Sequence, residues 1–443
     1  MIFLKLSPQQ QQSLQVFIIY IKQLYNKELV MALYLLIFIF GVTTQGGYLF
    51  YNEYRTIQVA LLLLLALTAC FYQRQSIIKT EILLFLCIVF CSFFWEQPTF
   101  IITDLLLFYL LYQCFHILSY KQLTSKIIVI SSLYIFAQLP FTLWDYVRTG
   151  IYQSIWYPLN WNIRVYNSYF LIVSIFAAWY YLTKQAYRYL YLLFLFLAFF
   201  AVLLDGGRSV TISYTLFIVI VSITYRQVRW HLIFTYITSW LAYFSVVYVA
   251  GFTSKGVSLR IARESSSGRI DLWENAYRCW LQHPIVGCGF YQREQYPNLP
   301  AHPHNIFLQV LSETGLLIFG LLIYITFIAM RRIRWKQTQS YFVIAALLAI
   351  GVDLFFSGVH IYPVTQMALL WLFLFLLKNP EFVDSNLYDQ VDSGKSTCIA
   401  SIFLLSFYFL VSVWFIFLFI KTQAFVSEVP FTPPRFWIYG YQL

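Results

Sequence analysis

The sequence predicts an all-α, polytopic membrane protein with about 12–14 transmembrane helices and one long extramembrane loop. Of its 443 residues, 60% are hydrophobic and only 11% are charged, which leaves no room for a large soluble domain. Apolar stretches long enough to cross the hydrocarbon recur about a dozen times. Because a bilayer offers no water to the backbone, each stretch must satisfy its own hydrogen bonds as a helix. The expected spans lie near residues 29–50, 57–72, 82–95, 100–118, 126–144, 165–182, 189–206, 209–225, 231–250, 304–330, 341–359, 364–377 and 398–420.

The net charge of +11 indicates orientation rather than nucleic-acid binding. With a cytoplasmic N-terminus, most Lys and Arg residues fall into loops on the cytoplasmic side, as membrane proteins prefer. We therefore expect no nucleic-acid partner. The chain divides into a cytoplasmic or interfacial lead-in (1–28), an N-terminal bundle (29–250), an outer loop (251–303), C-terminal transmembrane helices (304–420) and an outer tail (421–443).

The outer loop 251–303 is basic, although its side of the membrane should be poor in Lys and Arg. Within it, residues 267–282 have the apolar spacing of an amphipathic helix, with Ser267 as the expected N-cap. Cys279 and Cys288 both lie in this loop, and they could pair in an oxidising compartment, but their spacing alone does not decide it.

The stretch from His302 to Asn305 carries two of the six histidines and ends the loop where an apolar helix starts. Pro303 suits a first helical turn, so we expect His304 and Asn305 in that turn, at the membrane boundary. The positive end of the helix dipole favours a neutral imidazole there, which can accept a proton from a hydroxyl. The alternative is that His304 only caps the helix.

Two arginines are expected at helix starts, where the dipole disfavours a cation but favours an anion-binding group. Arg208 follows Asp205, Gly206 and Gly207, which interrupt a long apolar run. Arg269 begins the amphipathic helix. For Arg208 the alternative is a pair with Asp205 that closes a tight turn.

Two cations and a base at a lipid–water boundary suit a polyprenyl diphosphate that carries a sugar. The diphosphate would bind between Arg208 and Arg269, and His304 would take the proton from the attacking hydroxyl. One direct displacement predicts inversion at the anomeric carbon. The outer loops contain no Asp-x-Asp pair, so this hypothesis requires no metal and no cofactor.

Two further residues, His360 and Tyr362, are expected on the same side and are weaker candidates for lining the cavity. An alternative function of another class is a lipid or anion transporter, in which the arginines would bind an anion during transport without catalysing a reaction. That reading expects inverted repeats and paired charges near the midplane, and Asp353 is the one clear candidate charge inside a later span.

Residues from about 200 to 330 resemble the O-antigen ligase and O-antigen polymerase superfamily, membrane glycosyltransferases of the GT-C type. The resemblance rests on four features in order: Arg208 after a Gly/Ser turn; Gly268-Arg269 followed by Trp273 and Ala276; Pro284 with Gly287 and Gly289; and His304-Asn305 followed by Leu308, Glu313 and Gly315. Ile318 departs from the ligase pattern. Arg278 and Gly289 have the spacing of a polymerase motif, and the run from His302 to Asn305 is similar to O-linking oligosaccharyltransferases.

The resemblance implies an undecaprenyl-diphosphate-linked glycan donor and a periplasmic site in a Gram-negative inner membrane. His302, Asn305 and Arg278 belong to the segments that carry the resemblance, and Arg263 belongs to the basic outer loop; all four are expected substrate-binding residues beside Arg208 and Arg269. The expected activity is en bloc transfer, with Ser or Thr of a pilin-like protein narrowly favoured over lipid A core as acceptor. Polymerisation of repeat units remains the alternative within the family.

Overall fold

The computed structural model describes residues 50–72, 79–95, 98–151, 156–157, 163–253, 269–289, 302–383, 398–422 and 436. Within these ranges it confirms the all-α class, with one isolated antiparallel bridge between Ile333 and Val383 and no strand. The elements are α3 (Phe50–Tyr72), α4 (Lys79–Ser92), α5 (Pro98–Ile117), α6 (Gln122–Ser132), the 3-10 turn η1 (Leu133–Ala137), α7 (Leu139–Thr149), α8 (Ile163–Leu182), α9 (Arg188–Asp205), α10 (Arg208–Thr224), α11 (Arg229–Thr253), α12 (Arg269–Gln282), α13 (Ile306–Met330), α14 (Gln339–Phe356), α15 (Pro363–Lys378) and α17 (Cys398–Thr422).

The described ranges contain seven helices long and apolar enough to cross a membrane. They are Gln122–Thr149, Arg164–Leu182, Arg188–Asp205, Arg229–Gly251, Ile306–Met330, Gln339–Phe356 and Phe403–Lys421. Four shorter apolar helices accompany them: Thr80–Ser92, Ile102–Ile117, Arg208–Thr224 and Pro363–Lys378. The chain is therefore a multi-pass membrane protein. Of the expected span 29–50, residues 29–49 lie outside the described residues.

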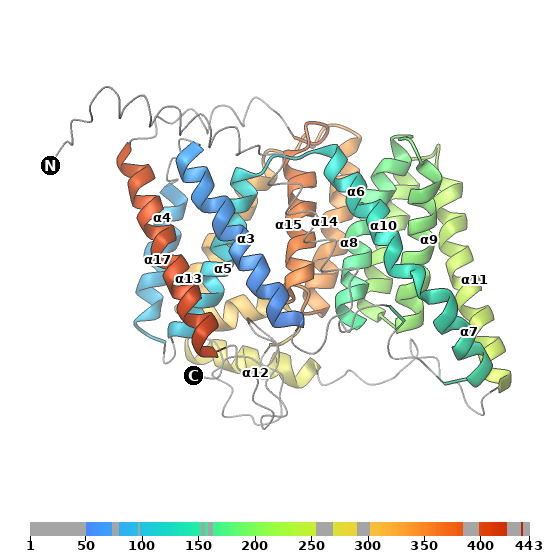
Figure 1. The fold of residues 1–443 in the computed structure, drawn as a ribbon, viewed down its shortest axis with the longest axis horizontal. Helices are drawn as coiled ribbons and strands as arrows, with labels where there is room; N and C mark the ends of the chain where they lie inside the picture. The colour runs from blue at the N-terminus through green and yellow to red at the C-terminus, as the bar shows by residue number, and fades with distance from the viewer. Residues whose placement is uncertain are drawn as a thin grey trace, which may run out of the picture.

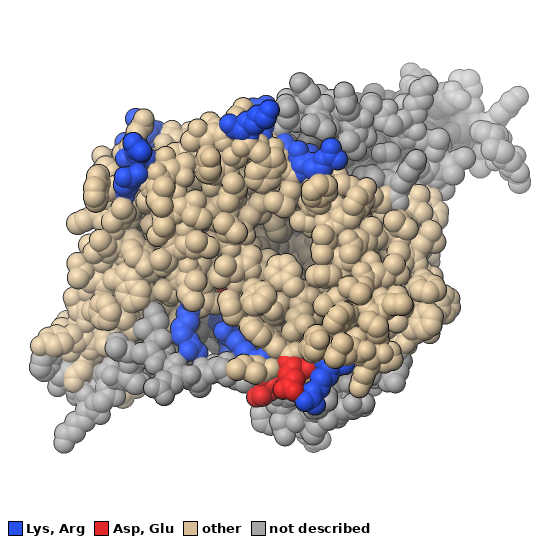
Figure 2. Space-filling model, turned by 180° about the vertical axis from the view of Figure 1, so that it is seen from behind, with Lys and Arg blue, Asp and Glu red and all other residues tan. Residues whose placement is uncertain are grey.

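The helices stand side by side, and α12 lies across one end of them (Figure 1). We call this end the α12 face. The middle of the bundle is α8, which is buried along nearly its whole length and packs against α9 and α15. Figure 2 shows a broad belt without charged side chains, with Lys and Arg along the opposite edge and in a recess at the α12 face. That belt is the expected lipid-facing surface.

The expected span 126–144 is one bent element rather than one straight helix. The segments α6, η1 and α7 follow one another across residues 122–149, and η1 makes the tighter turn between them. Helical structure also extends beyond the expected end at residue 144, because α7 continues to Thr149. Gly150, which has a left-handed backbone (φ +67°), ends this helix.

Glycines separate α9 from α10. Gly206 has φ +69° and ends α9, and α10 then starts at Arg208, as the sequence predicts. A Cβ on Gly207 would lie 2.5 Å from the side-chain nitrogen of Asn167 on α8. The turn therefore packs closely against α8, and it places Arg208 at the N-terminus of α10.

The start of α13 differs from the expectation. The helix begins at Ile306, and Asn305 is its N-cap, with its side-chain oxygen accepting a hydrogen bond from the Leu308 amide at 3.0 Å. Neither Pro303 nor His304 is in the first turn. Asn satisfies an otherwise unpaired amide at this position, which explains why the helix starts there.

A second difference is a break in α13 at Gly315, which has φ +70° and ψ −178°. The turn after α12, residues 283–289, fills the break with backbone hydrogen bonds. The amides of Cys288 and Gly289 donate to the carbonyls of Ser312 and Glu313, at 2.9 and 3.1 Å. Amides on the other side of the break donate back to the turn, from Leu316 to Pro284 and from Leu317 to Ile285. Backbone groups that an ordinary helix would pair internally are therefore paired across the break.

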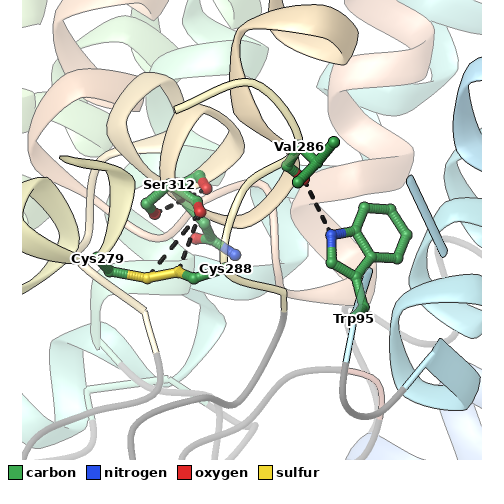
Figure 3. Close-up of a disulfide and its surroundings, with 6 residues drawn as sticks. Trp95, Cys279, Val286, Cys288 and Ser312 are labelled. Atoms are coloured by element: carbon green, nitrogen blue, oxygen red, sulfur yellow. Dashed lines mark hydrogen bonds between the residues drawn. A yellow bond between two sulfur atoms is a disulfide. The ribbon is translucent and has the colours of Figure 1, made fainter. Parts of the chain in front are cut away.

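A disulfide joins Cys279 at the end of α12 to Cys288 in this turn (Figure 3). Their Cα atoms are 6.0 Å apart. On the opposite side of the turn, the indole of Trp95 donates to the Val286 carbonyl at 2.9 Å. The turn is thus held to α12 covalently and to the segment after α4 by a hydrogen bond.

Candidate functional site

The centre of the site is a pair of buried histidines in the loop before α13. His302 is 2% exposed and His304 is 7% exposed. His302 Nε2 and His304 Nδ1 are 3.0 Å apart. His304 has φ +54°, a left-handed backbone that few residues other than glycine adopt and that costs on the order of 1 kcal/mol. Such strain is found at functional sites more often than elsewhere.

Arg164, near the N-terminus of α8, fixes the protonation pattern of this pair. Its Nη1 lies 3.0 Å from Nε2 of His304. A guanidinium only donates hydrogen bonds, so Nε2 must accept. A neutral His304 therefore carries its proton on Nδ1 and donates it to Nε2 of His302. This tautomer follows from the two contacts.

Three arginines stand in the first turns of three helices: Arg164 on α8, Arg208 on α10 and Arg269 on α12. Arg164 contacts His304, and both Arg164 and Arg208 act electrostatically on Arg269. Burial lowers the pKa of Arg269 below its ordinary value, and repulsion from Arg164 and Arg208 lowers it further. Nε of Arg269 is buried without a hydrogen-bond partner. Like charges held together with an unused donor are the arrangement expected of an anion site.

Near the arginines is the carboxylate of Asp353, at the end of α14. Asp353 is 1% exposed, and its charge acts on Arg269. The hydroxyls of Ser168 and Ser357 are also close to it. This carboxylate offsets part of the positive charge of the cluster.

The α12 helix is tied to the histidine loop through Trp273, whose indole donates to the carbonyl of Pro303 at 2.9 Å. Arg269 begins this helix on its inner side. Arg278 is nine residues further on, so a helix of 3.6 residues per turn places it on the opposite side. There it is exposed and pairs with Glu274 at 2.5 Å.

The loop between α14 and α15 forms the floor under the histidines. A Cβ on Gly358 would lie 2.7 Å from Nε2 of His302 and 3.3 Å from Nδ1 of His304, so only a glycine leaves both rings in place. Two side chains fix this loop in place by donating hydrogen bonds to its backbone carbonyl oxygens. Gln366 donates to the carbonyl of His360 at 2.8 Å, and Arg55, a fully buried residue of α3, donates to that of Ile361 at 2.6 Å.

His360 points away from the pair, towards α13. Its Nε2 donates to Oε1 of Gln309 at 2.9 Å, and Nε2 of Gln309 lies 3.3 Å from the carboxylate of Glu313. Tyr362 is buried at the start of α15. Both residues therefore support the floor loop.

The site residues expected from sequence divide into two groups. Arg208 and Arg269 act on one another electrostatically, and His302, His304 and Asn305 follow one another in the same loop. Arg278 faces away on α12, and Arg263 lies outside the described residues. Among the described residues, no three or more His, Cys, Asp or Glu side chains are grouped to hold a metal ion.

Sequence reasoning missed Arg164, which stands just before the expected span 165–182. The signal was present, because Arg164 also stands at the beginning of an apolar run, the same criterion that selected Arg208. Gly358 was missed as well. Its role depends on a contact with rings more than fifty positions away, which no local pattern reports.

A family model described as O-antigen ligase matches residues 192–325, from early α9 to late α13. The matched segment contains Arg208, Arg269, the disulfide, both histidines and the break at Gly315. Arg164, Asp353 and Gly358 lie outside it. No curated protein matches the chain.

Proposed function

We propose that this chain, a member of the O-antigen ligase superfamily and a membrane glycosyltransferase of the ligase or polymerase type, transfers a glycan en bloc from an undecaprenyl-diphosphate-linked donor to an acceptor hydroxyl. We place the site at the periplasmic side of a bacterial inner membrane. The observation that carries the proposal is the group of mutually repelling guanidiniums beside a buried, hydrogen-bonded histidine pair.

In this mechanism the diphosphate binds to Arg208 and Arg269. Their positive charge stabilises the negative charge that develops on the leaving oxygen. Both guanidiniums are partly buried, which strengthens this effect because electrostatic interactions weaken in water. The helix N-termini of α10 and α12 add their own unpaired amides and dipoles.

His304 is the general base. Its Nε2 takes the proton of the acceptor hydroxyl while that oxygen attacks the anomeric carbon. The bond from the carbon to the diphosphate breaks as the new bond forms, so the configuration inverts. His302 orients the ring of His304 through the hydrogen bond to Nδ1 and stabilises the imidazolium that results.

For the acceptor we favour Ser or Thr of a pilin-like protein over lipid A core. The support is the sequence from His302 to Asn305, which is similar to O-linking oligosaccharyltransferases. Polymerisation of repeat units is supported only by the spacing of Arg278 and Gly289, and Arg278 pairs with Glu274 on the exposed side of α12.

The test uses purified protein with a defined undecaprenyl-diphosphate glycan. Three acceptors are offered: a pilin-like protein, lipid A core and a second donor molecule. We expect product on the protein acceptor, and loss of that product in His304→Ala. The control is His283→Ala, an exposed histidine in the turn after α12, which should retain activity.

Three other outcomes would contradict parts of the proposal. Product on lipid A core or on a second donor would identify a ligase or a polymerase. Full activity in His304→Ala would show that His304 is not the general base. Transport of the donor across a vesicle membrane, with no glycosylated product, would show that the protein is a transporter and not a transferase.

A further inference from the structure

The contact between Arg164 and His304 has a chemical consequence for the order of events in the site. Nε2 is the nitrogen that must take the acceptor's proton. In this structure, its lone pair already accepts a hydrogen bond from the guanidinium at 3.0 Å. A lone pair engaged in this way is less available for a proton. The base is therefore occupied while no donor is bound.

Arg164 has a second possible partner. It lies close enough to Arg269 to repel it, and Arg208 does the same. Unlike the histidines, Arg164 is exposed at the α12 face, so its side chain has room to move. A diphosphate bound between the other two guanidiniums would bring negative oxygens to this third one. Arginine hydrogen bonds to phosphate are stronger than those to a neutral acceptor.

From these observations we infer that Arg164 couples donor binding to activation of the base. Without donor, its guanidinium occupies Nε2 of His304. When the diphosphate binds, the guanidinium turns to a phosphate oxygen and Nε2 becomes available to the acceptor hydroxyl. Arg164 is then a positioning residue that enforces donor-first order and protects the site from premature proton transfer. This inference rests on the proposed function.

Two further features support this assignment. His302 holds Nδ1 of His304, so the ring cannot turn freely when Arg164 leaves, and Nε2 remains directed at the same place. The floor at Gly358 touches both rings from the other side. Nε2 of His304, which faces the Arg164 guanidinium, is therefore the ring atom that can exchange its hydrogen-bond partner without a rearrangement of the loop. Arg164 also lies outside the segment matched by the family model.

The direct test is nitrogen NMR of the full-length protein in lipid nanodiscs, with ¹⁵N-labelled histidine. The signals of His304 are assigned by their loss in His304→Gln. In the wild type without ligand, we expect a protonated Nδ1 and an unprotonated, hydrogen-bonded Nε2. Farnesyl diphosphate, a short prenyl diphosphate, serves as the probe and should shift the Nε2 signal towards that of a nitrogen without a donor.

The variant is Arg164→Met, which keeps the length of the side chain but has no donor. Its Nε2 signal should resemble that of the probe-bound wild type before any probe is added, and the probe should then change it little. Arg164→Lys should restore part of the wild-type response. The matched control is Arg148→Met, an exposed arginine of α7 at the same face, which should behave as the wild type.

Kinetics supply the second measurement. Losing one charge-assisted contact with the diphosphate should raise the donor KM of Arg164→Met by roughly tenfold to a hundredfold. Its acceptor-dependent turnover at saturating donor should fall far less than that of His304→Ala. In the wild type the steady-state pattern should require donor before acceptor, and Arg164→Met should lose this order.

The two proposals fail differently. A protonated Nε2 in the ligand-free wild type, or an equal response to the probe in Arg164→Met, overturns the role of Arg164 even if glycan transfer depends on His304. If no acceptor receives glycan but the wild type and Arg164→Met differ as expected, the coupling stands and the proposed reaction is wrong.

Discussion

Gly358→Ala tests the geometry of the site with one added methyl group. The new Cβ would lie 2.7 Å from Nε2 and 3.1 Å from Cδ2 of His302, and 3.3 Å from Nδ1 of His304. Ordinary carbon contacts begin near 3.5 Å. The His302 ring must therefore move by roughly 1 Å, since the floor loop is held by buried hydrogen bonds from Arg55 and Gln366.

The expected loss can be estimated from that displacement. A displacement of about 1 Å at a reacting group costs up to about 10²-fold in rate, and a weakened hydrogen bond between the histidines adds about 0.5–1.5 kcal/mol. We therefore expect kcat/KM for glycan transfer to fall by about two orders of magnitude. Donor affinity should change little, because the three atoms nearest to the added Cβ all belong to the two histidines and none to an arginine.

The assay is transfer kinetics with the acceptor that proves active, beside thermal unfolding in detergent. Gly351→Ala is the matched control, because a Cβ at Gly351 in α14 meets nothing within 4 Å. This control should keep its activity and gain up to about 1 kcal/mol of stability. Wild-type kcat/KM in a folded Gly358→Ala variant would refute the argument that the glycine makes room for the pair.

Three further predictions concern the elements around the pair. Gly315→Ala adds a Cβ 2.2 Å from a backbone carbonyl oxygen at a position with φ +70°, so we expect the folded protein to be lost from membranes. Gly320→Ala in the same helix has open space around the new Cβ and should express normally. Normal expression of both variants would show that the break is not needed. Replacing Cys279 and Cys288 by Ser should lower the free energy of unfolding by roughly 2–3 kcal/mol, because the bridge closes a short loop. Thermal unfolding measures this, and in the wild type both thiols should react with an alkylating agent only after reduction; reaction without reduction would contradict the bridge. Burial and the neighbouring guanidiniums lower the pKa of Arg269. In Arg269→Lys the same surroundings act on an ammonium group, whose ordinary pKa is only about 10.4. The cationic form is lost as pH rises through a lowered pKa, so the variant should be active near pH 6 and lose activity at alkaline pH, where the wild type stays constant. Parallel pH profiles would contradict the lowering of the pKa at this position.

Much of the fold could be predicted because its signals are local. Apolar length and charge balance indicated the membrane class. The glycines after Asp205 indicated that a helix restarts beside Arg208, and α10 begins at Arg208, one residue before the expected span. The amphipathic spacing of α12 was equally visible, and the helix begins in the described residues at Arg269.

The break in α13 could not be predicted in the same way. Gly315 occurs inside an apolar run, where a single glycine is normally tolerated in a continuous helix. What opens the helix is a turn from another part of the chain that pairs with its backbone. The start of the helix was misplaced for a local reason, since Pro303 was preferred over Asn305 although both are suitable near a helix start.

The candidate site was predictable residue by residue but not as an arrangement. Helix-dipole arguments selected two of the three clustered arginines, and the same argument applies to Arg164 once α8 is known to begin at Ile163. The hydrogen bond from Arg164 to His304 spans 140 positions of sequence. Nothing in the pattern of either segment indicates the other.

The break at Gly315 has a mechanical consequence. The first half of α13 is joined to the turn after α12 through backbone hydrogen bonds, and the turn is joined to α12 through the disulfide. The second half of α13 is joined to the same turn, because the amides of Leu316 and Leu317 donate to the carbonyls of Pro284 and Ile285. The turn therefore connects both halves of α13 to α12. Because Trp273 also joins α12 to the histidine loop, these links restrain any movement of Arg269 relative to the histidines.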